Sequence, residues 1–526
     1  MIAKKCPCCG ASVEVDAETN SVCKFCGATL FDETAVTAQA LQPKNTTNTQ
    51  NENINDNDIV EENNNNDSSK KNKHKKFFDK SLFTLKDGLG ELNLFKLAIP
   101  HFLDLFFIST LALISTIVIN RFIPGGAVAV EAANRLINII IVITNLICTG
   151  ANILISIYMG REDLETVRKL CYINIVFTII INVLLSVIIF IFAEPFLNLV
   201  NSNSTPEEIR TGLVYLRVRV CFLSMNSLST CLLGMLRCFG DNKPTLISGI
   251  IQTIVSTGLN FLALTQKTQT AKLYWVSFAP VIATFVGLSI SYICWKLKRF
   301  KLTCKIDFKL LGKLLKVGAP GGVSNLSYTL SQLITTAFVF ALPLPYKNAR
   351  VYLNQILYMV YHFGYALGNA NAIMVGRRCG AGDLETADKM HKQNIFIAVI
   401  SNAVFFTLVF ACKDLIFKVF SPDAETMKII TIVLAIDFFV EIGRAFNHMG
   451  EFGLNGVGDV YATTIISVSG CWLISVLLAY IFGVLLDMKL VGIWLAFAID
   501  EIVRGMLYLI RWCSGRWKKK FIEKRI

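Results

Sequence analysis

Charged residues are scarce in this chain: they make up 17% of its 526 residues, whereas a soluble protein carries roughly 25%. Hydrophobic residues account for 53%. They gather in blocks of about 20 residues, such as 173–192 and 465–486, which are long enough to span a bilayer as helices. The blocks lack the residue-by-residue alternation of transmembrane β-strands. Because only helices and closed barrels satisfy their backbone polar groups in lipid, we expect an all-α polytopic membrane protein.

Sequence features of several function classes are missing as well. The chain contains no G-x-x-x-x-G-K-[ST] loop, which argues against ATP-driven transport by this chain alone. It also has no nucleophile–base constellation that would indicate an enzyme. Residues 1–5 lead into a polar, cysteine-rich stretch, so the first spanning helix is expected to serve as its own insertion signal. The 51 basic residues exceed the 38 acidic ones, but they lie between the apolar blocks, which favours membrane topology over nucleic-acid binding.

Three clusters of basic residues set the expected orientation. One precedes the first spanning helix, one separates the two halves of the chain, and one follows the last helix. They comprise Lys70, Lys71, Lys73, Lys75 and Lys76; Lys296, Lys298, Arg299, Lys301, Lys305, Lys309, Lys313 and Lys316; and Arg516, Lys518, Lys519, Lys520, Lys524 and Arg525. With an even number of spans all three lie on one side, which the positive-inside rule makes cytoplasmic. We therefore expect a multi-pass protein of the cell membrane with both termini in the cytoplasm.

Composition divides the chain into four regions. Residues 1–35 form a Cys/Gly-rich segment, and 36–79 form a linker rich in Asn, Asp and Lys that has too few apolar residues to offset its ordering entropy, so we expect it to be disordered. Residues 80–305 and 306–526 then each supply a six-helix lobe, the second with a basic tail. The twelve expected spanning helices have centres near 108, 146, 182, 224, 254, 285, 328, 364, 402, 439, 474 and 500.

The two halves repeat one another. Residues 160–170 (GREDLETVRKL) match 380–390 (GAGDLETADKM) at six of eleven positions. The pair Lys96 and Pro100 recurs as Lys316 and Pro320, and Gly240-Asp241 recurs as Gly458-Asp459 at nearly the same spacing. Six helices per copy is an even number, so both copies enter the membrane in the same direction. Parallel repeats of this kind are related by an axis along the membrane normal, with the substrate site expected between them near the midplane.

The repeated loops also resemble a known family. Residues 376–389 (GRRCGAGDLETADK) are similar to the loop after the second helix of a half in the multidrug and toxic compound extrusion (MATE) family. Residues 454–459 (LNGVGD) and 236–244 (LRCFGDNKP) resemble its Gly-Asp loop, and 490–504 (LVGIWLAFAIDEIVR) resembles its twelfth helix. The resemblance covers about residues 90–515. It implies a V-shaped twelve-helix fold that exports organic cations in exchange for protons or sodium ions.

One position departs from that family. Many bacterial members carry an acidic residue about fifteen positions after the proline of the first helix, where this chain has Ser115, and the second copy has Thr335. Asp104 lies one helical turn after Pro100. It either replaces the missing carboxylate or lies in water near the end of the helix.

Seven ionisable residues fall within two expected helices of the second half. They are Asp437, Glu441, Arg444 and His448 near 439, and Asp500, Glu501 and Arg504 near 500. The first four are spaced i, i+4, i+7 and i+11, which predicts one stripe on a helix. A charge at the bilayer centre costs about 2.5–3.5 kcal/mol on insertion scales, so it needs a partner or a function. Two interpretations remain open: an ion-pair network that joins the two helices, or a carboxylate cluster that binds a cation and exchanges it for H⁺ or Na⁺.

We assign the coupling role to Glu441 and the rest of its stripe, facing the twelfth helix. Asn369 and Asn371 are candidates for hydrogen bonds to the substrate, although such amides often join helices instead. His101 and His362 are expected to be packing or interface residues.

The N-terminal cysteines follow a metal-binding pattern. Cys6-x-x-Cys9 and Cys23-x-x-Cys26 are separated by thirteen residues, and a glycine follows each pair. This is the knuckle pattern of a zinc ribbon. Four protein ligands make the expected site structural rather than catalytic. Cys8 is either the spare thiol or a ligand in place of Cys6. A cytosolic partner of the ribbon is a further expectation.

Three functions compete at this point. The first is an ion-coupled exporter of organic cations, drugs or metabolites. The second is a lipid-linked oligosaccharide flippase of the same superfamily fold, which would favour a cationic cavity for a pyrophosphate. The third is a membrane anchor that transports nothing and displays the zinc ribbon.

Overall fold

The computed structural model describes residues 2–5, 12–15, 21–22, 29–30, 84–87, 90–122, 126–200, 206–303 and 305–524. The chain divides into two units, 1–80 and 81–526. In the first unit, β1 (Ile2–Lys5) pairs antiparallel with β2 (Ser12–Val15), and β3 (Ser21–Val22) pairs antiparallel with β4 (Thr29–Leu30). The predicted zinc ligands Cys6, Cys9, Cys23 and Cys26, and the predicted 36–79 linker, lie outside the described residues.

The second unit begins with a hairpin that was not predicted. Strand β5 (Thr84–Asp87) pairs with β6 (Gly90–Asn93), and Leu85 and Leu92 are buried. The Leu92 side chain fills the space beside Gly240, where an added Cβ would lie 2.5 Å from it. The Asp-Gly pair at positions 87–88 of the sequence, which has Leu85 two residues before it and Leu89 directly after it, is a recognised hairpin signal. The hairpin therefore covers the Gly-Asp turn of the first repeat.

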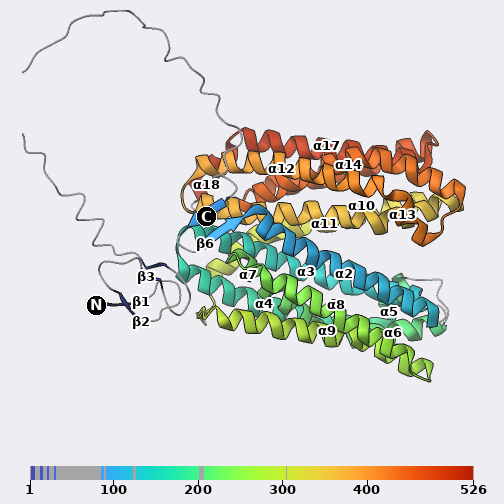
Figure 1. Cartoon of the computed structure of the whole chain (residues 1–526), viewed down its shortest axis with the longest axis horizontal. Helices are drawn as coiled ribbons and strands as arrows, with labels where there is room; N and C mark the ends of the chain where they lie inside the picture. The colour runs from blue at the N-terminus through green and yellow to red at the C-terminus, as the bar shows by residue number, and fades with distance from the viewer. Residues whose placement is uncertain are drawn as a thin grey trace, which may run out of the picture. The chain divides into compact units, whose positions relative to one another are not determined.

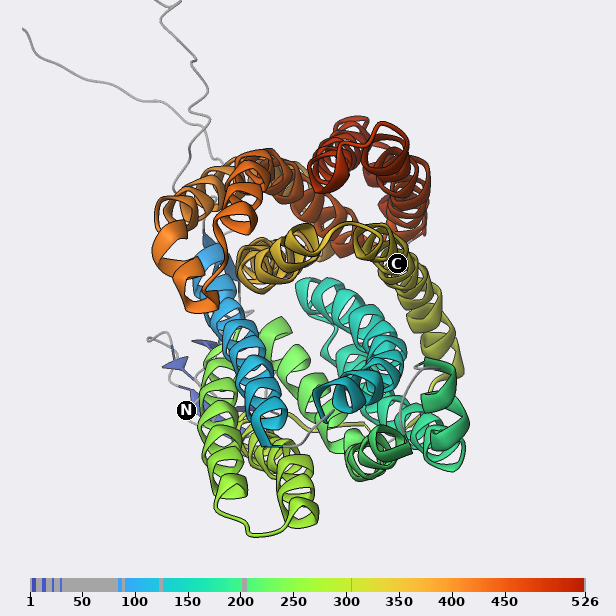
Figure 2. The same ribbon diagram turned by 90° about the vertical axis from the view of Figure 1, so that its right-hand side faces the viewer.

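Long helices make up the rest of this unit and form two sets of six (Figures 1 and 2). The first set is α2 (Leu94–Phe122), α3 (Gly126–Gly160), α4 (Leu164–Ile191), the pair α6 (Pro206–Cys221) and α7 (Leu223–Cys238), α8 (Lys243–Leu264) and α9 (Gln269–Leu297), with the short α5 (Ala193–Val200) between α4 and α6. The second set is α10 (Phe308–Phe340), α11 (Leu344–Gly380), α12 (Leu384–Ala411), α14 (Ala424–Gly456), the run from α15 (Val460–Ser469) through η3 (Gly470–Val476), α16 (Leu477–Tyr480) and η4 (Ile481–Leu485), and α17 (Lys489–Cys513). Short α13 (Lys413–Phe417) and η2 (Lys418–Phe420) lie between α12 and α14, and α18 (Arg516–Lys524) follows α17. Each of the twelve predicted helix centres falls within one of these segments.

Length and hydropathy alone identify fewer spans. Within the described ranges, six helices are long and apolar enough to cross a membrane, or seven if α6 and α7, which bend by 47°, form one span. The remaining long helices include α14 and α17, which contain the ionisable residues described above. Helices α14 and α17 do not meet the hydropathy criterion because they carry polar side chains that are buried inside the second set.

The repeated sequence motifs form repeated local structures. In both copies the aspartate of the DLET motif caps the following helix: Asp163 accepts a hydrogen bond from the backbone N–H of Thr166, and Asp383 accepts one from that of Thr386, at 3.0 and 3.1 Å. Such a cap satisfies a backbone donor that the first helical turn leaves free. Gly240 and Gly458 have φ of +84° and +76°, the left-handed conformation that ends a helix. The repeated motifs therefore mark the same helix starts and helix ends in the two halves of the chain.

The two sets meet through α2 and α3 of the first and α10 and α11 of the second. The contact is reciprocal. A Cβ on Gly160 would lie 2.0 Å from the carbonyl oxygen of Arg377, and a Cβ on Gly380 would lie 2.0 Å from that of Ile157. The two glycines are equivalent positions of the two copies, and so are Ile157 and Arg377, as expected for copies related by a twofold axis. This confirms the predicted two-repeat layout.

The reciprocal contact leads to a stability prediction. Gly160→Ala is expected to lower the free energy of unfolding by about 1–3 kcal/mol, because the methyl group would overlap a backbone carbonyl that cannot rotate away. The matched control is Gly312→Ala in α10, where an added Cβ has no neighbour within 4 Å. That change is expected to be neutral or to stabilise by about 0.5–1 kcal/mol. Thermal unfolding of the purified full-length protein would measure both, and equal effects would contradict the prediction.

Candidate functional site

A polar cavity of about 130 Å³ lies within the second set of helices. Its wall comes from α10, α11, α14, η3 and α17. The ionisable side chains that line it are Arg350, Asp437, Arg444, Asp500 and Glu501, and its aromatic side chains are Tyr328, Tyr358, Tyr361, Trp494 and Phe497. This charged cavity therefore lies inside one half, whereas the sequence analysis expected a site between the halves.

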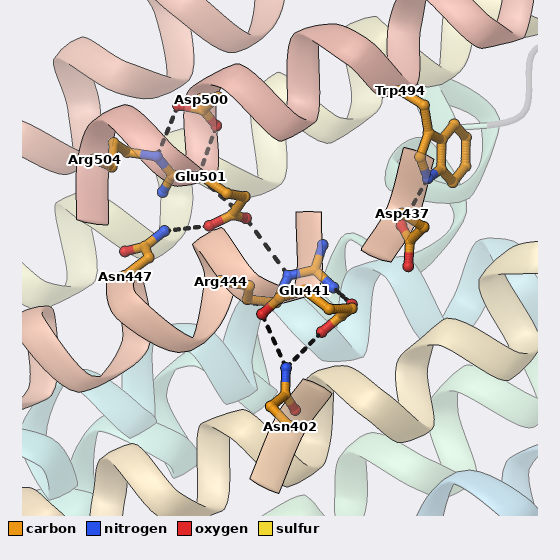
Figure 3. Close-up of polar contacts among 9 residues, drawn as sticks. All are labelled: Asn402, Asp437, Glu441, Arg444, Asn447, Trp494, Asp500, Glu501 and Arg504. Atoms are coloured by element: carbon orange, nitrogen blue, oxygen red, sulfur yellow. Dashed lines mark hydrogen bonds and ion pairs between the residues drawn. The ribbon is translucent and has the colours of Figure 1, made fainter. Parts of the chain in front are cut away.

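Two carboxylates of α17 share an arginine of the same helix. Arg504 donates from Nε to Asp500 at 2.8 Å and from Nη2 at 2.6 Å, and it lies 3.3 Å from Glu501. All three residues are buried. A two-pronged pair of this kind is the strong geometry for a guanidinium and a carboxylate. Asn447 of α14 also donates to Glu501 (Figure 3).

A second arginine joins α14 to this group. Arg444 forms an ion pair with Glu441 one turn away on α14, and its Nε lies 3.5 Å from Glu501. On the other side of Glu441, Asn402 of α12 donates its Nδ2 to both the carboxylate, at 3.2 Å, and the backbone carbonyl, at 2.9 Å (Figure 3). Glu441 thus connects α12 to the charged group on α17 through Arg444.

Helix η3 widens where it passes this group. It is π-helical, and a Cβ on Gly470 would lie 2.3 Å from Cδ of Arg504. Glycine at this position therefore lets the Arg504 side chain lie against the backbone of η3. Single turns of π-helix occur often at functional sites.

Asp437 is separate from the two shared arginines. Its Oδ1 accepts a hydrogen bond of 2.7 Å from Nε1 of Trp494 on α17, and its Oδ2 has no partner among the described residues. Only 1% of Asp437 is exposed. The carboxylate therefore has unused hydrogen-bonding capacity at the cavity.

The predicted stripe on α14 divides between three neighbouring helices. Asp437 and Arg444 contact α17, and Glu441 contacts α12. His448 instead lies edge-on to Tyr361 of α11, with ring centroids 5.1 Å apart. Neither of its ring nitrogens has a hydrogen-bond partner in the described part of the chain. A period of 3.6 residues places the four side chains on one side of α14. Three different helices pack against that side, so the four side chains have different neighbours.

Asp104 is buried in the first set of helices. It is 7% exposed and packs against Gly249 of α8, where an added Cβ would lie 2.3 Å from its Oδ1. The alternative that Asp104 lies in water near the helix end is therefore wrong. Thr335 is also buried and donates to Ser331 of its own helix at 3.1 Å. Ser115 lies in α2, but its side chain is outside the described part.

Asn371 joins two helices instead of facing this cavity. Its carbonyl oxygen accepts from Asn394 of α12 at 3.0 Å, and its amide lies 2.9 Å from Nδ1 of His391. Asn369 lies one helical turn from Tyr365 on the same helix. Neither amide is among the residues that line the cavity.

The two remaining histidines lie where the halves meet. Ser109 of α2 lies 3.0 Å from Nε2 of His362 on α11. His101 of α2 lies 3.4 Å from Arg237 and packs near Tyr365. Both positions agree with the predicted interface role. In the described residues no group of three His, Cys, Asp or Glu side chains is placed to hold a metal ion.

The residues of the site that were not predicted include Arg350, Asn402, Asn447 and Trp494, which make polar contacts there, and the other aromatic residues of the cavity wall. Arg350 lies 14 residues before the centre expected for its helix, near 364, so a span of about 20 residues did not include it. The two amides and the indole carried no sequence signal, because such residues are common in helices and only their neighbours give them a role.

Comparison with known proteins identifies the family. The MatE family model matches residues 100–262 and again residues 320–481. Among curated proteins, "Uncharacterized transporter YisQ" of Bacillus subtilis is 27% identical over 450 residues, which is 84% of this chain and 98% of YisQ. "Probable multidrug resistance protein NorM" of Thermotoga maritima is 22% identical over 388 residues, covering 72% and 82% of the two chains.

Solved structures share the fold. A mutant of the Vibrio cholerae MATE transporter VcmN superposes with a TM-score of 0.74 at 14% identity, covering 80% of this chain and 96% of VcmN. A MATE structure in the bent conformation gives 0.73 at 16% identity, with 82% and 96% covered. The family model matches once in each half of the chain, which agrees with the two sets of six helices. This chain belongs to the MatE family of multi-pass membrane transporters, and it is not an enzyme.

Proposed function

We propose that this protein exports organic cations in exchange for protons or sodium ions, and that the coupling ion is held in the second half. The observation that carries the proposal is a mismatch in charge. Three buried carboxylates, Glu441, Asp500 and Glu501, share two guanidinium groups, those of Arg444 and Arg504. A buried charge that lacks a counter-ion is costly. Binding a proton or a sodium ion at one of the three carboxylates would remove the excess.

Glu441 is the best candidate for that carboxylate. Asp500 faces Arg504 through two hydrogen bonds, and Glu501 lies within ion-pair distance of both arginines. Glu441 has only Arg444 as a cationic partner among the described residues, with the neutral amide of Asn402 on its other side. A cationic substrate in the cavity would compete with the coupling ion for this excess charge. Such competition is sufficient to couple two opposed fluxes.

Reconstituted protein would test the function directly. Full-length protein in proteoliposomes is expected to move ethidium, an aromatic cation, down an imposed gradient of H⁺ or Na⁺. Adding ethidium without a gradient is expected to drive the coupling ion in the opposite direction. Ethidium movement that is independent of both gradients would contradict ion coupling. No movement at all, in liposomes with verified insertion, would favour the membrane-anchor alternative.

The flippase alternative fits the cavity less well. A pyrophosphate would require mainly cationic walls, whereas three carboxylates and two guanidinium groups line this one. The relatives named for multidrug resistance, such as NorM, also favour export of small molecules. We further propose that the loops with the basic clusters and both termini face the cytoplasm, on the strength of the lysine distribution and the even number of helices.

We also propose a structural zinc ion at the N-terminus. Each cysteine pair falls, in sequence, between two strands that pair antiparallel: Cys6 and Cys9 between β1 and β2, and Cys23 and Cys26 between β3 and β4. Paired strands on either side of each C-x-x-C suit the two knuckles of a zinc ribbon. Bound zinc would tie the two hairpins together and supply their folding free energy.

Metal analysis of the full-length protein would test this proposal. One zinc per chain is expected, and Cys23→Ser should remove it because three thiolates hold the ion far less tightly. Cys8→Ser is the control, and it should leave zinc in place. Stoichiometric zinc that survives Cys23→Ser, or a wild-type chain without zinc after purification under reducing conditions, would show that the site is absent.

A further inference from the structure

Arg350 of α11 is, among the described residues, the one cavity arginine outside the shared ion pairs. It is 7% exposed and lines the cavity. Its Nη2 donates to the neutral amide oxygen of Gln332 on α10, at 3.3 Å, and its Nε has no hydrogen-bond partner among the described residues. No carboxylate lies within ion-pair distance of it in the described part of the chain. A guanidinium has five N–H donors, so this buried cation retains unused donors at the cavity.

Arg350 and Asp437 lie on different parts of one indole. The guanidinium carbon of Arg350 is 4.8 Å from the ring centroid of Trp494, and 5.5 Å from that of Phe497. Asp437 accepts a hydrogen bond from the indole Nε1 of the same tryptophan. The ring thus holds a cation at its face and an anion at its edge. Both charges are more than nine-tenths buried, and both have a polar atom without a partner among the described residues.

The rest of the wall suits a flat, aromatic ligand. Three tyrosines and Phe497 line the cavity beside Trp494. Aromatic side chains favour stacked or edge-on contacts with another ring. A ligand that met both free charges would need an ammonium group for Asp437 and an anionic group for Arg350.

We propose that this cavity recognises an aromatic zwitterion, whose carboxylate binds Arg350 and whose ammonium group binds Asp437. The proposal rests on the function proposed above: the ammonium group of the zwitterion is the cationic part of the exported molecule, and the carboxylate narrows the substrate class of the same cavity. It separates two roles within the site: Arg350 and Asp437 select the substrate, whereas Glu441, Arg444 and Glu501 hold the coupling charge. In the competing interpretation Arg350 only fastens α11 to α10 and α17 through Gln332 and Trp494.

Three probes of one shape separate these interpretations. Tryptophan is the zwitterion, tryptophanamide is the cation that lacks the carboxylate, and indole-3-propionate is the anion that lacks the ammonium group. Equilibrium dialysis with the purified full-length protein, without any ion gradient, measures their binding. Tryptophan is expected to bind at least about tenfold more tightly than either relative, since each missing charge forfeits a charged hydrogen bond.

Variants then assign each charge to its partner. Arg350→Gln is expected to weaken tryptophan binding by about tenfold or more, to the level of tryptophanamide, and to change tryptophanamide binding by less than about threefold. Arg350→Lys retains the charge and should restore part of the preference. Asp437→Asn should reduce tryptophan binding to the level of indole-3-propionate. A purely structural Arg350 would instead lower the binding of all three probes together, in step with the melting temperature.

Three outcomes would overturn the proposal: equal binding of tryptophanamide and tryptophan by the wild-type protein, an equal effect of Arg350→Gln on both, or no binding of any probe. These outcomes differ from failure of the proposed function, which would appear as ethidium movement that no ion gradient drives. Binding preference is measured without a gradient, so either proposal can fail while the other stands.

Discussion

Glu441→Gln is expected to abolish ion-driven transport and to leave folding and expression intact. The amide keeps the shape of the side chain and can still contact Asn402 and Arg444, but it cannot take up or release a proton and carries no charge for sodium. With Glu441 neutral, two carboxylates face two guanidinium groups and the excess charge is gone. Gradient-driven ethidium movement in proteoliposomes should fall to the level of liposomes without protein. Binding of ethidium itself should weaken and should no longer depend on the concentration of H⁺ or Na⁺, because the excess charge for which the two cations compete is gone.

Asp104→Asn provides the comparison for this experiment. Asp104 is the buried carboxylate of the other half, and it packs between α2 and α8 away from the cavity. If coupling is in the second half, Asp104→Asn should keep most of the gradient-driven movement. Wild-type transport with unchanged pH dependence in Glu441→Gln, together with loss in Asp104→Asn, would place coupling in the first half and refute the assignment.

Arg444→Ala is expected to destabilise the protein by about 3–5 kcal/mol, because it leaves buried carboxylates without their shared cation. Glu441 would lose its cationic partner, whereas Glu501 would keep Arg504 at 3.3 Å. Thermal unfolding of the purified protein measures the loss. Arg210→Ala is the matched control: this arginine is exposed on α6, so its replacement should change stability by no more than about 0.5 kcal/mol.

A double variant distinguishes lost charge pairing from lost packing. Adding Glu441→Gln to Arg444→Ala removes the carboxylate that has no second cation beside it, so a large part of the stability should return. Residues in one ion-pair network commonly show coupling of about 0.5–3 kcal/mol in such cycles. Strictly additive losses would mean that Arg444 acts through packing, for example through its contact with Tyr361, and that the charge mismatch has little weight.

The charged residues of α14 show what the spacing of residues along a helix can and cannot predict. Spacing along the sequence correctly predicted that Asp437, Glu441 and Arg444 lie on the side of the helix that faces other helices. It could not separate Glu441 from Asp437, because one contacts α12 and the other contacts α17. It also grouped His448 with them, although that ring packs against Tyr361. A repeat of 3.6 residues specifies a side of a helix, not the neighbour that occupies it.

The sequence by itself determined the membrane class, the two copies and the family. These follow from apolar block length, from the recurrence of the first half's motifs in the second, and from short loop motifs, each of which can be read along the chain. Only the tertiary structure decided which carboxylate shares which arginine, and that Arg350 and Asp437 meet at Trp494. Three of the ion pairs each lie within one helix at a spacing of three or four residues, which the sequence shows. The pair between Arg444 and Glu501 and the two contacts of Trp494 join different helices that lie far apart in the chain, and no sequence spacing fixes them. These contacts matter for stability because the charges are buried: a charge removed from water is costly unless the fold places a partner beside it.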